Sequence, residues 1–156
     1  MMTPNLSAWY LASFDVQKFF SLILWLAGVG HFCVLIASFQ VPGRLHWNED
    51  LKQLTPFNRK LMWVYSGFTV FTIIAFGILT LALHYEFLHG DRAALALALF
   101  IGVYWTLRIV VEFFYYDLAD WPRGRGMVAG RILLTLLFIY LAGSNLALFV
   151  WKAFAQ

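Results

Sequence analysis

The chain has 156 residues, of which 62% are hydrophobic and only 12% are charged, with a formal net charge of +3. A soluble domain carries about 25% charged residues and roughly 45–50% apolar ones. In so short a chain the surplus apolar side chains cannot all be buried inside one globule, because surface still dominates volume. They must face something other than water, and we expect a lipid bilayer.

Four apolar segments are long enough to cross a bilayer, and they cover residues 19–39, 61–83, 93–116 and 132–151. Each meets the length of about 20 residues that a helix needs to span a hydrocarbon core. Only the third contains charged residues, Arg108 and Glu112. The connections are short, so consecutive helices should pack as antiparallel neighbours. The sequence therefore predicts an all-α, polytopic membrane protein with one domain, residues 1–156, and four transmembrane helices in a compact bundle.

Lys and Arg are distributed unevenly between the two sides that four spans create. The N-terminus, the second loop and the C-terminus hold three of them, whereas the first and third loops hold seven: Arg44, Lys52, Arg59, Lys60, Arg123, Arg125 and Arg131. By the positive-inside rule these two loops should be cytoplasmic, which places both termini on the outer side of the cell membrane. The first apolar segment is too long for the apolar core of a signal peptide, so we expect it to remain in the mature protein as a transmembrane helix.

The longest loop, residues 40–60, carries apolar residues at helical spacing, namely Trp47, Leu51 and Leu54. With charged residues between them, they predict a short amphipathic helix from Asn48 to Leu54 on the cytoplasmic membrane surface. Asn48 suits the N-cap, and Pro56 should end any helix soon afterwards. In the third loop, Trp121 and Pro122 are expected to form a turn anchored at the membrane interface.

Arg108 and Glu112 are the most informative residues for function. They are four apart, so they share one helical face and are expected to form an intrahelical ion pair that faces the bundle interior. Ionisable groups within a membrane are unfavourable and mark a functional site by default. Two interpretations stay open: a structural pair that fixes the rotation of the helix, or a ligand site.

Each of the last three segments carries a stripe of small, polar or aromatic residues. The stripes are Tyr65, Thr69, Thr72, Phe76 and Thr80 in the second, Tyr104, Trp105, Arg108, Val111, Glu112 and Tyr115 in the third, and Arg131, Thr135, Phe138, Ala142 and Asn145 in the fourth. Such stripes are typical of helix–helix interfaces in membranes, where small residues permit close approach and hydroxyls bond across helices. We therefore expect these faces to pack against other helices.

His31 is the histidine that lies clearly inside a span, and Ala27, Gly28 and Gly30 leave room for another helix beside it. A buried, neutral histidine bonded to a hydroxyl or to Glu112 is the favoured interpretation. A proton carrier or a metal ligand is the alternative, since imidazole titrates near neutral pH. The one cysteine, Cys33, excludes an internal disulfide and is interpreted as a small packing residue.

Motifs for cofactors or catalysis are missing from the sequence. It has no phosphate-binding glycine loop, nucleophile elbow, HExxH motif or cysteine pair. A bis-histidine haem needs two facing histidines at matching depth, and none pairs naturally with His31. The group His84, Glu86, His89 and Asp91 has no zinc signature and is interpreted as a solvated loop. The sequence thus predicts no metal site, assigns no cofactor and, lacking a basic run, indicates no nucleic-acid partner.

Two functional hypotheses follow. The first is a non-catalytic subunit or scaffold, whose partners are membrane lipids and other membrane subunits or further copies of itself. The alternative is a membrane enzyme or carrier for a lipid-like substrate, in which Arg108 holds an anionic head group and Glu112 orients it or moves a proton. Its pocket would open to the cytoplasm and be lined by His31, Trp63, Tyr65, Tyr104, Trp105, Arg108 and Glu112. Ion transport is disfavoured because the ionisable groups gather in one half of the membrane.

Overall fold

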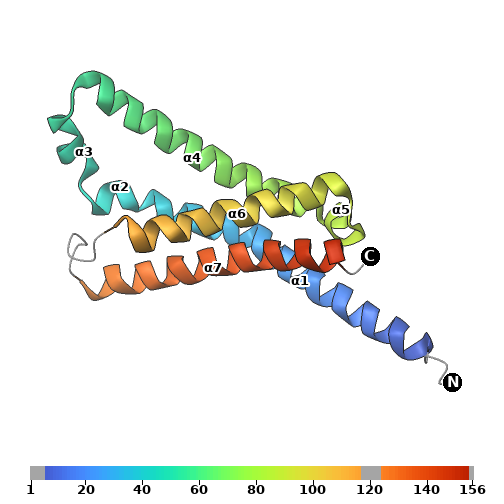
Figure 1. Cartoon of the computed structure of the whole chain (residues 1–156). Helices are drawn as coiled ribbons and strands as arrows, with labels where there is room; N and C mark the ends of the chain where they lie inside the picture. Colours follow the sequence, from blue (N-terminus) through green and yellow to red (C-terminus); the bar gives the residue numbers. More distant parts are fainter. Residues whose placement is uncertain (1–5, 117–123, 155–156) are drawn as a thin grey trace.

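The computed structural model describes residues 6–116 and 124–154. Four long helices dominate it: α1 (Leu6–Phe39), α4 (Pro56–Ala82), α6 (Arg92–Phe114) and α7 (Arg125–Phe154). The connections contain short helical pieces: α2 (Val41–Arg44), α3 (Trp47–Asp50), the 3-10 turn η1 (Leu51–Gln53) and α5 (His84–His89). Within these two ranges there is no strand, and four helices are long and apolar enough to cross a membrane. The predicted all-α, four-span architecture is confirmed (Figure 1).

Local sequence signals set several helix ends. Thr55 caps α4, because its hydroxyl accepts a hydrogen bond from the Asn58 amide at 3.4 Å, and Pro56 occupies the first helical position. Proline is favoured there, since the first amide of a helix has no intrahelical acceptor. Gly90 ends α5 in the left-handed conformation with φ 79°, which glycine adopts without strain. The prediction that Pro56 ends the preceding helical segment is confirmed, since η1 stops at Gln53 and Leu54 is extended, and the same proline then starts α4.

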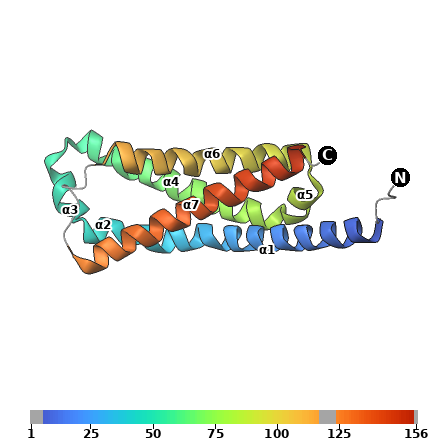
Figure 2. The same cartoon turned by 60° about the horizontal axis from the view of Figure 1, so that its bottom comes forward.

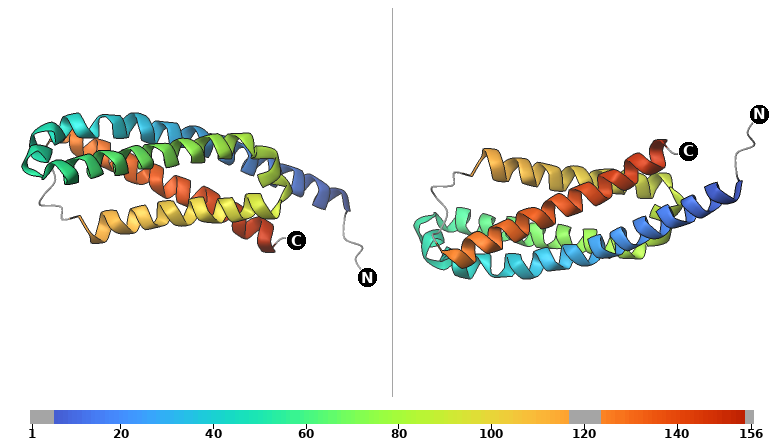
Figure 3. Two further views of the ribbon diagram at one scale, coloured as in Figure 1. Left: turned by 90° about the horizontal axis from the view of Figure 1, so that it is seen from above. Right: turned by 90° about the horizontal axis from the view of Figure 1, so that it is seen from below.

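The long helices pack as two antiparallel pairs, α1 with α4 and α6 with α7, and α7 also packs along α1. Figure 2 shows α7 running obliquely between α1 and α6. The consecutive helices α4 and α6 do not pack side by side along their whole length. α4 and α6 approach each other near α5 and separate toward the opposite end of the bundle (Figure 1), whereas α4 runs beside α1 in both views of Figure 3. The far half of α4 is therefore left with little cover from α6.

Glycines allow α1 to approach two helices closely. A Cβ added at Gly28 would lie 2.5 Å from the Leu81 side chain of α4, and one added at Gly77 would lie 2.9 Å from the Phe32 ring. On another side of α1, a Cβ at Gly30 would lie 3.3 Å from Leu137 and Leu141 of α7. The expectation that Gly28 and Gly30 admit neighbouring helices beside His31 is confirmed.

The core lies where the four helices meet and is built from apolar side chains: Ala27, Val34, Leu35, Ile73, Phe76, Ile101, Trp105, Phe138, Leu141 and Ala142. A second cluster of Leu24, Phe87, Ala94, Ala98 and Leu148 packs α5 against α1, α6 and α7. Cys33 is exposed, so it does not serve as the packing residue that was predicted.

The first connection differs from its prediction in detail. Instead of one helix from Asn48 to Leu54, the chain forms α3 and then η1, and α3 begins at Trp47 after His46 adopts the left-handed conformation at φ 50°. Leu51 is buried, and the Trp47 ring lies 6.2 Å from Trp63 of α4. These contacts tie the connection to the start of α4. The predicted turn at Trp121 and Pro122 lies outside the described residues.

Candidate functional site

His31 is fully buried at the centre of the bundle and is held by two hydrogen bonds. Its Nδ1 lies 2.7 Å from the Ala27 carbonyl oxygen, and its Nε2 lies 3.1 Å from the Trp105 indole nitrogen. A carbonyl only accepts and an indole N–H only donates. These partners therefore require Nδ1 to carry the proton and Nε2 to accept, which is the neutral imidazole.

This arrangement agrees with the predicted buried, neutral histidine but not with its predicted partners. The bond to Nε2 comes from Trp105 rather than from a hydroxyl or Glu112. Both ring nitrogens are occupied, so binding a metal or a second proton would require one of these buried hydrogen bonds to break. The geometry makes His31 and Trp105 a rigid link between α1 and α6.

Aromatic rings extend this link toward the other two helices. Trp105 stacks on Phe138 of α7, with ring centroids 5.0 Å apart and planes at 20°. Tyr104 meets Phe76 of α4 edge to face at 5.1 Å, and Phe76 also lies 6.0 Å from His31. Such edge-to-face pairs stabilise beyond the apolar area that they bury. These rings join α4 to α6 at this level of the bundle.

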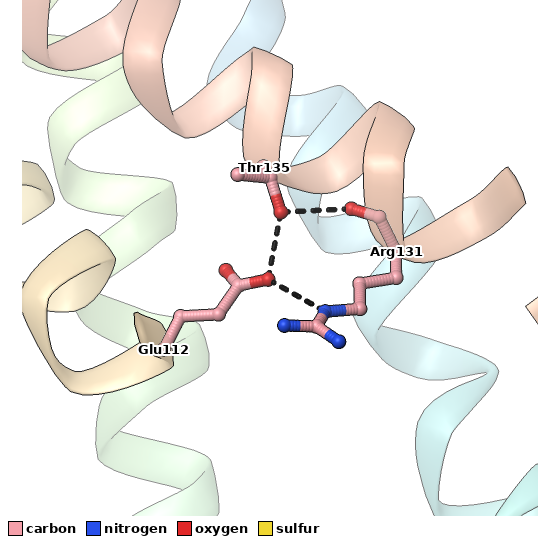
Figure 4. Close-up of polar contacts among 3 residues, drawn as sticks. All are labelled: Glu112, Arg131 and Thr135. Atoms are coloured by element: carbon pink, nitrogen blue, oxygen red, sulfur yellow. Dashed lines mark hydrogen bonds and ion pairs between the residues drawn. The ribbon is translucent and has the colours of Figure 1, made fainter. Parts of the chain in front are cut away.

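Glu112 lies about two helical turns beyond Trp105 on α6 and bonds to α7 (Figure 4). Its side chain is 4% exposed, and its Oε1 accepts from Arg131 Nε at 3.2 Å and from the Thr135 hydroxyl at 2.7 Å. The Thr135 oxygen also lies 3.0 Å from the Arg131 carbonyl oxygen. An interhelical ion pair with an added hydroxyl therefore neutralises the buried carboxylate and fixes the register of α6 against α7.

The predicted ion pair between Arg108 and Glu112 is wrong. Within the part of the chain that the structure describes, the carboxylate pairs with Arg131, and Arg108 Nη1 is buried without a hydrogen-bond partner. Two physical reasons account for this. An acidic residue that follows the basic one along a helix is the less favourable order for a pair at this spacing. In addition, α7 offers Glu112 a hydroxyl as well as a charge.

Arg108 instead contacts aromatic rings. Its guanidinium carbon lies 5.2 Å from the centre of the Phe138 ring and 6.0 Å from that of Tyr116. Both distances fall within the usual range for a cation over a ring face. The side chain as a whole is partly buried. Arg108 thus belongs to the α6–α7 contact through Phe138 rather than through Glu112.

Two of the predicted pocket residues lie apart from this group. Trp63 is 46% exposed and its ring contacts Trp47, while Tyr65 is 60% exposed. The structure brings together His31, Tyr104 and Trp105, with Arg108 and Glu112 adjoining them along α6. Of the third-segment stripe, Val111 and Tyr115 are exposed, so they do not pack against other helices of this chain.

The other end of the bundle holds the residues interpreted as a solvated loop. Most of them lie in the helix α5 instead, where the imidazole of His84 meets the Ser21 hydroxyl of α1 at 3.0 Å and His89 stacks on Tyr85. Among the described residues no group of three His, Cys, Asp or Glu side chains could hold a metal ion.

Arg131 and Thr135 are the functional-site residues that sequence reasoning did not assign. Both had been placed in the packing stripe of the fourth segment, but not opposite Glu112. The signal was available, since an arginine and a threonine four apart near the start of the fourth segment match an acid near the end of the third, which is the same end of two antiparallel neighbours. No family model, curated protein or solved structure matches this chain.

Proposed function

We propose that this integral membrane protein is a non-catalytic subunit or scaffold, and that the uncovered half of α4 receives a transmembrane helix of another subunit. One observation carries the proposal. The stripe on α4 is buried at Phe76 and Thr80, whereas the same face is exposed at Tyr65 and Thr69. An interface pattern thus continues along α4 beyond the point where helices of this chain cover it.

The burial of α4 supports this reading. No residue from position 56 to position 72 is buried, and the buried residues of the helix are Ile73, Phe76, Gly77 and Thr80. Only 22% of its most apolar stretch is buried inside the chain, compared with 39% for α1. α4 is therefore the helix with the most surface left for another protein or for lipid.

The chemistry of the exposed stripe favours a protein helix over lipid alone. Thr69 and Thr72 are short, so they permit close approach of another backbone. Their hydroxyls donate to the Tyr65 and Phe68 carbonyls at 3.0 and 2.9 Å. A docked helix would consequently leave neither threonine hydroxyl proton unsatisfied. Tyr65 adds a large, rigid contact area at the end of the stripe.

The orientation forms part of the proposal. The N-terminal end of α1 and the C-terminal end of α7 lie at one end of the bundle, and α2, α3 and the N-terminal ends of α4 and α7, which carry Arg44, Lys52, Arg59, Lys60, Arg125 and Arg131, lie at the other (Figure 1). With the basic loops cytoplasmic, the open half of α4 lies in the cytoplasmic half of the membrane. A partner would therefore dock on the cytoplasmic side of the midplane.

Purification from native membranes in a mild detergent tests the proposal. Native mass spectrometry should give a partner at fixed stoichiometry, either another subunit or a second copy of this chain. Thr69→Trp, which fills the stripe, should abolish that association. Gly67→Trp is the matched control, because a side chain added at Gly67 meets nothing within 4 Å. A lone monomer from gently solubilised membranes, or equal loss in both variants, would contradict the proposal.

The alternative function, an enzyme or carrier for a lipid-like substrate, is favoured by a different observation. Arg108 holds a buried guanidinium nitrogen without an acceptor among the described residues, which suits recognition of an anionic head group. A small lipid converted or transferred by the purified protein, with activity lost in Arg108→Gln, would select this function over the scaffold.

A further inference from the structure

We propose that Arg108 binds a phosphate group at the end of the bundle where α6 ends and where α2 and α3 lie. The phosphate is supplied either by an anionic lipid head group or by free phosphate. This inference is separate from the scaffold function, because the bound group would be a structural ligand of α6 and α7. Its starting point is the buried Nη1 of Arg108, which has no acceptor among the described residues.

A buried donor on a permanently charged group needs an acceptor. A guanidinium stays charged under all physiological conditions, and charged groups within a membrane are paired in nearly all cases. Neither neighbouring ring of Arg108, Phe138 or Tyr116, carries a negative charge. The aromatic contacts therefore position the guanidinium without compensating its charge.

The nearest acid on the same helix face is already engaged. Glu112 Oε1 accepts from both Arg131 and Thr135, and both bonds come from α7. Turning this carboxylate toward Arg108 would break an interhelical contact at a position that is 4% exposed. Because the Arg108 side chain is only partly buried, it can turn toward an acceptor from outside the chain, which would satisfy Nη1 with the pair left intact.

Depth and chemistry both favour a phosphate group as that acceptor. Arg108 lies six residues before Phe114, the end of α6, which is about 9 Å along the axis at 1.5 Å per residue. A long arginine side chain at such a depth can extend toward the head-group region. The guanidinium fork matches two phosphate oxygens at once. A phosphate bound there would pair with the guanidinium of Arg108 from the side of the membrane interface, while the rings of Phe138 and Tyr116 contact it from the protein side.

Thermal unfolding of delipidated protein in a non-ionic detergent provides the test. Phosphatidylglycerol, phosphatidylcholine and inorganic phosphate are titrated separately, with sodium chloride matched for ionic strength. Wild-type protein should be stabilised saturably by phosphatidylglycerol if the source is lipid, or by inorganic phosphate if it is the free ion. Phosphatidylcholine, whose choline group offsets the phosphate charge, should have a smaller effect.

Variants then locate the site. Arg108→Gln should weaken the apparent affinity at least about tenfold, the scale of one charged hydrogen-bonding interaction. Arg44→Gln is the matched control, since Arg44 is exposed at the same end of the bundle, and it should retain wild-type affinity. If Arg108→Gln does not fold, Arg108→Lys keeps the charge without the fork and should still bind more weakly. No saturable stabilisation of wild type, or equal affinity in Arg108 and Arg44 variants, would overturn the proposal.

Discussion

The contact between Glu112 and α7 makes a quantitative prediction for the variant Glu112→Leu. The substitution removes the acceptor of two hydrogen bonds, from Arg131 at 3.2 Å and from Thr135 at 2.7 Å. Thr135 loses little, because its single hydroxyl proton can turn to the Arg131 carbonyl at 3.0 Å. Arg131 loses a charged hydrogen bond, for which measured contributions are about 1.5–3 kcal/mol.

The size of the loss follows from these terms. The Arg131 contact is longer than the usual 2.7–2.9 Å of charged pairs, and its side chain is 17% exposed, so the lower part of that range applies. We expect Glu112→Leu to reduce the free energy of unfolding by about 2 kcal/mol, and Glu112→Gln, which keeps an acceptor oxygen, by about 1 kcal/mol. Unfolding by sodium dodecyl sulfate in mixed micelles, followed by circular dichroism, measures both values.

A double-mutant cycle identifies the partner. Glu112→Gln combined with Arg131→Gln should give a coupling energy of about 1 kcal/mol or more, as expected for residues in one ion-pair network. The cycle of Glu112→Gln with Arg108→Gln should be additive within about 0.5 kcal/mol. Strong coupling to Arg108 together with none to Arg131 would refute the pairing across α6 and α7.

Three further predictions concern packing, the buried histidine and topology. Gly77→Leu should destabilise the chain by about 1–3 kcal/mol, because its Cβ would meet the Phe32 ring at 2.9 Å. Gly67→Leu is the control, since its side chain has open space and the variant should unfold like wild type. Equal effects of the two substitutions would contradict the close approach of α1 and α4. Trp105→Phe leaves His31 Nε2 without its donor and should lower the free energy of unfolding by about 1–3 kcal/mol, while Trp63→Phe at an exposed position should change it by less than about 0.5 kcal/mol. In a Cys33→Ser background, an impermeant thiol reagent applied to intact cells should label Phe154→Cys and not Lys52→Cys, and the reverse pattern would invert the proposed orientation.

The helices and their number could be predicted from the sequence because they depend on local properties. A run of apolar residues without charge, such as 61–83, leaves a bilayer span as its stable arrangement. The role of Gly28 and Gly30 was equally local, since a missing side chain leaves space whichever helix fills it. The stripe from Arg131 to Asn145 was likewise visible as a packing face, and in the structure its members are buried or partly buried.

The partners of individual polar residues could not be predicted in the same way. Glu112 has an arginine four residues before it on its own helix and another on α7, and the choice between them depends on the rotation of α6 against α7, which the sequence pattern does not give. The hydrogen bond from Trp105 to His31 depends on the same three-dimensional relation. The separation of α4 from α6 also leaves no local mark, because the stripe from Tyr65 to Thr80 has one spacing throughout, although only its second half is buried.

Photocrosslinking in native membranes tests most directly whether the open half of α4 receives a protein partner. A photoreactive phenylalanine analogue is placed at Tyr65, on the stripe, and separately at Phe71, on the opposite side of the same helix. The two positions are similarly exposed, at 60% and 67%. Our account predicts one crosslinked product of fixed mass from position 65 and only lipid adducts from position 71. Lipid adducts alone at both positions, or the same protein products from both, would contradict it.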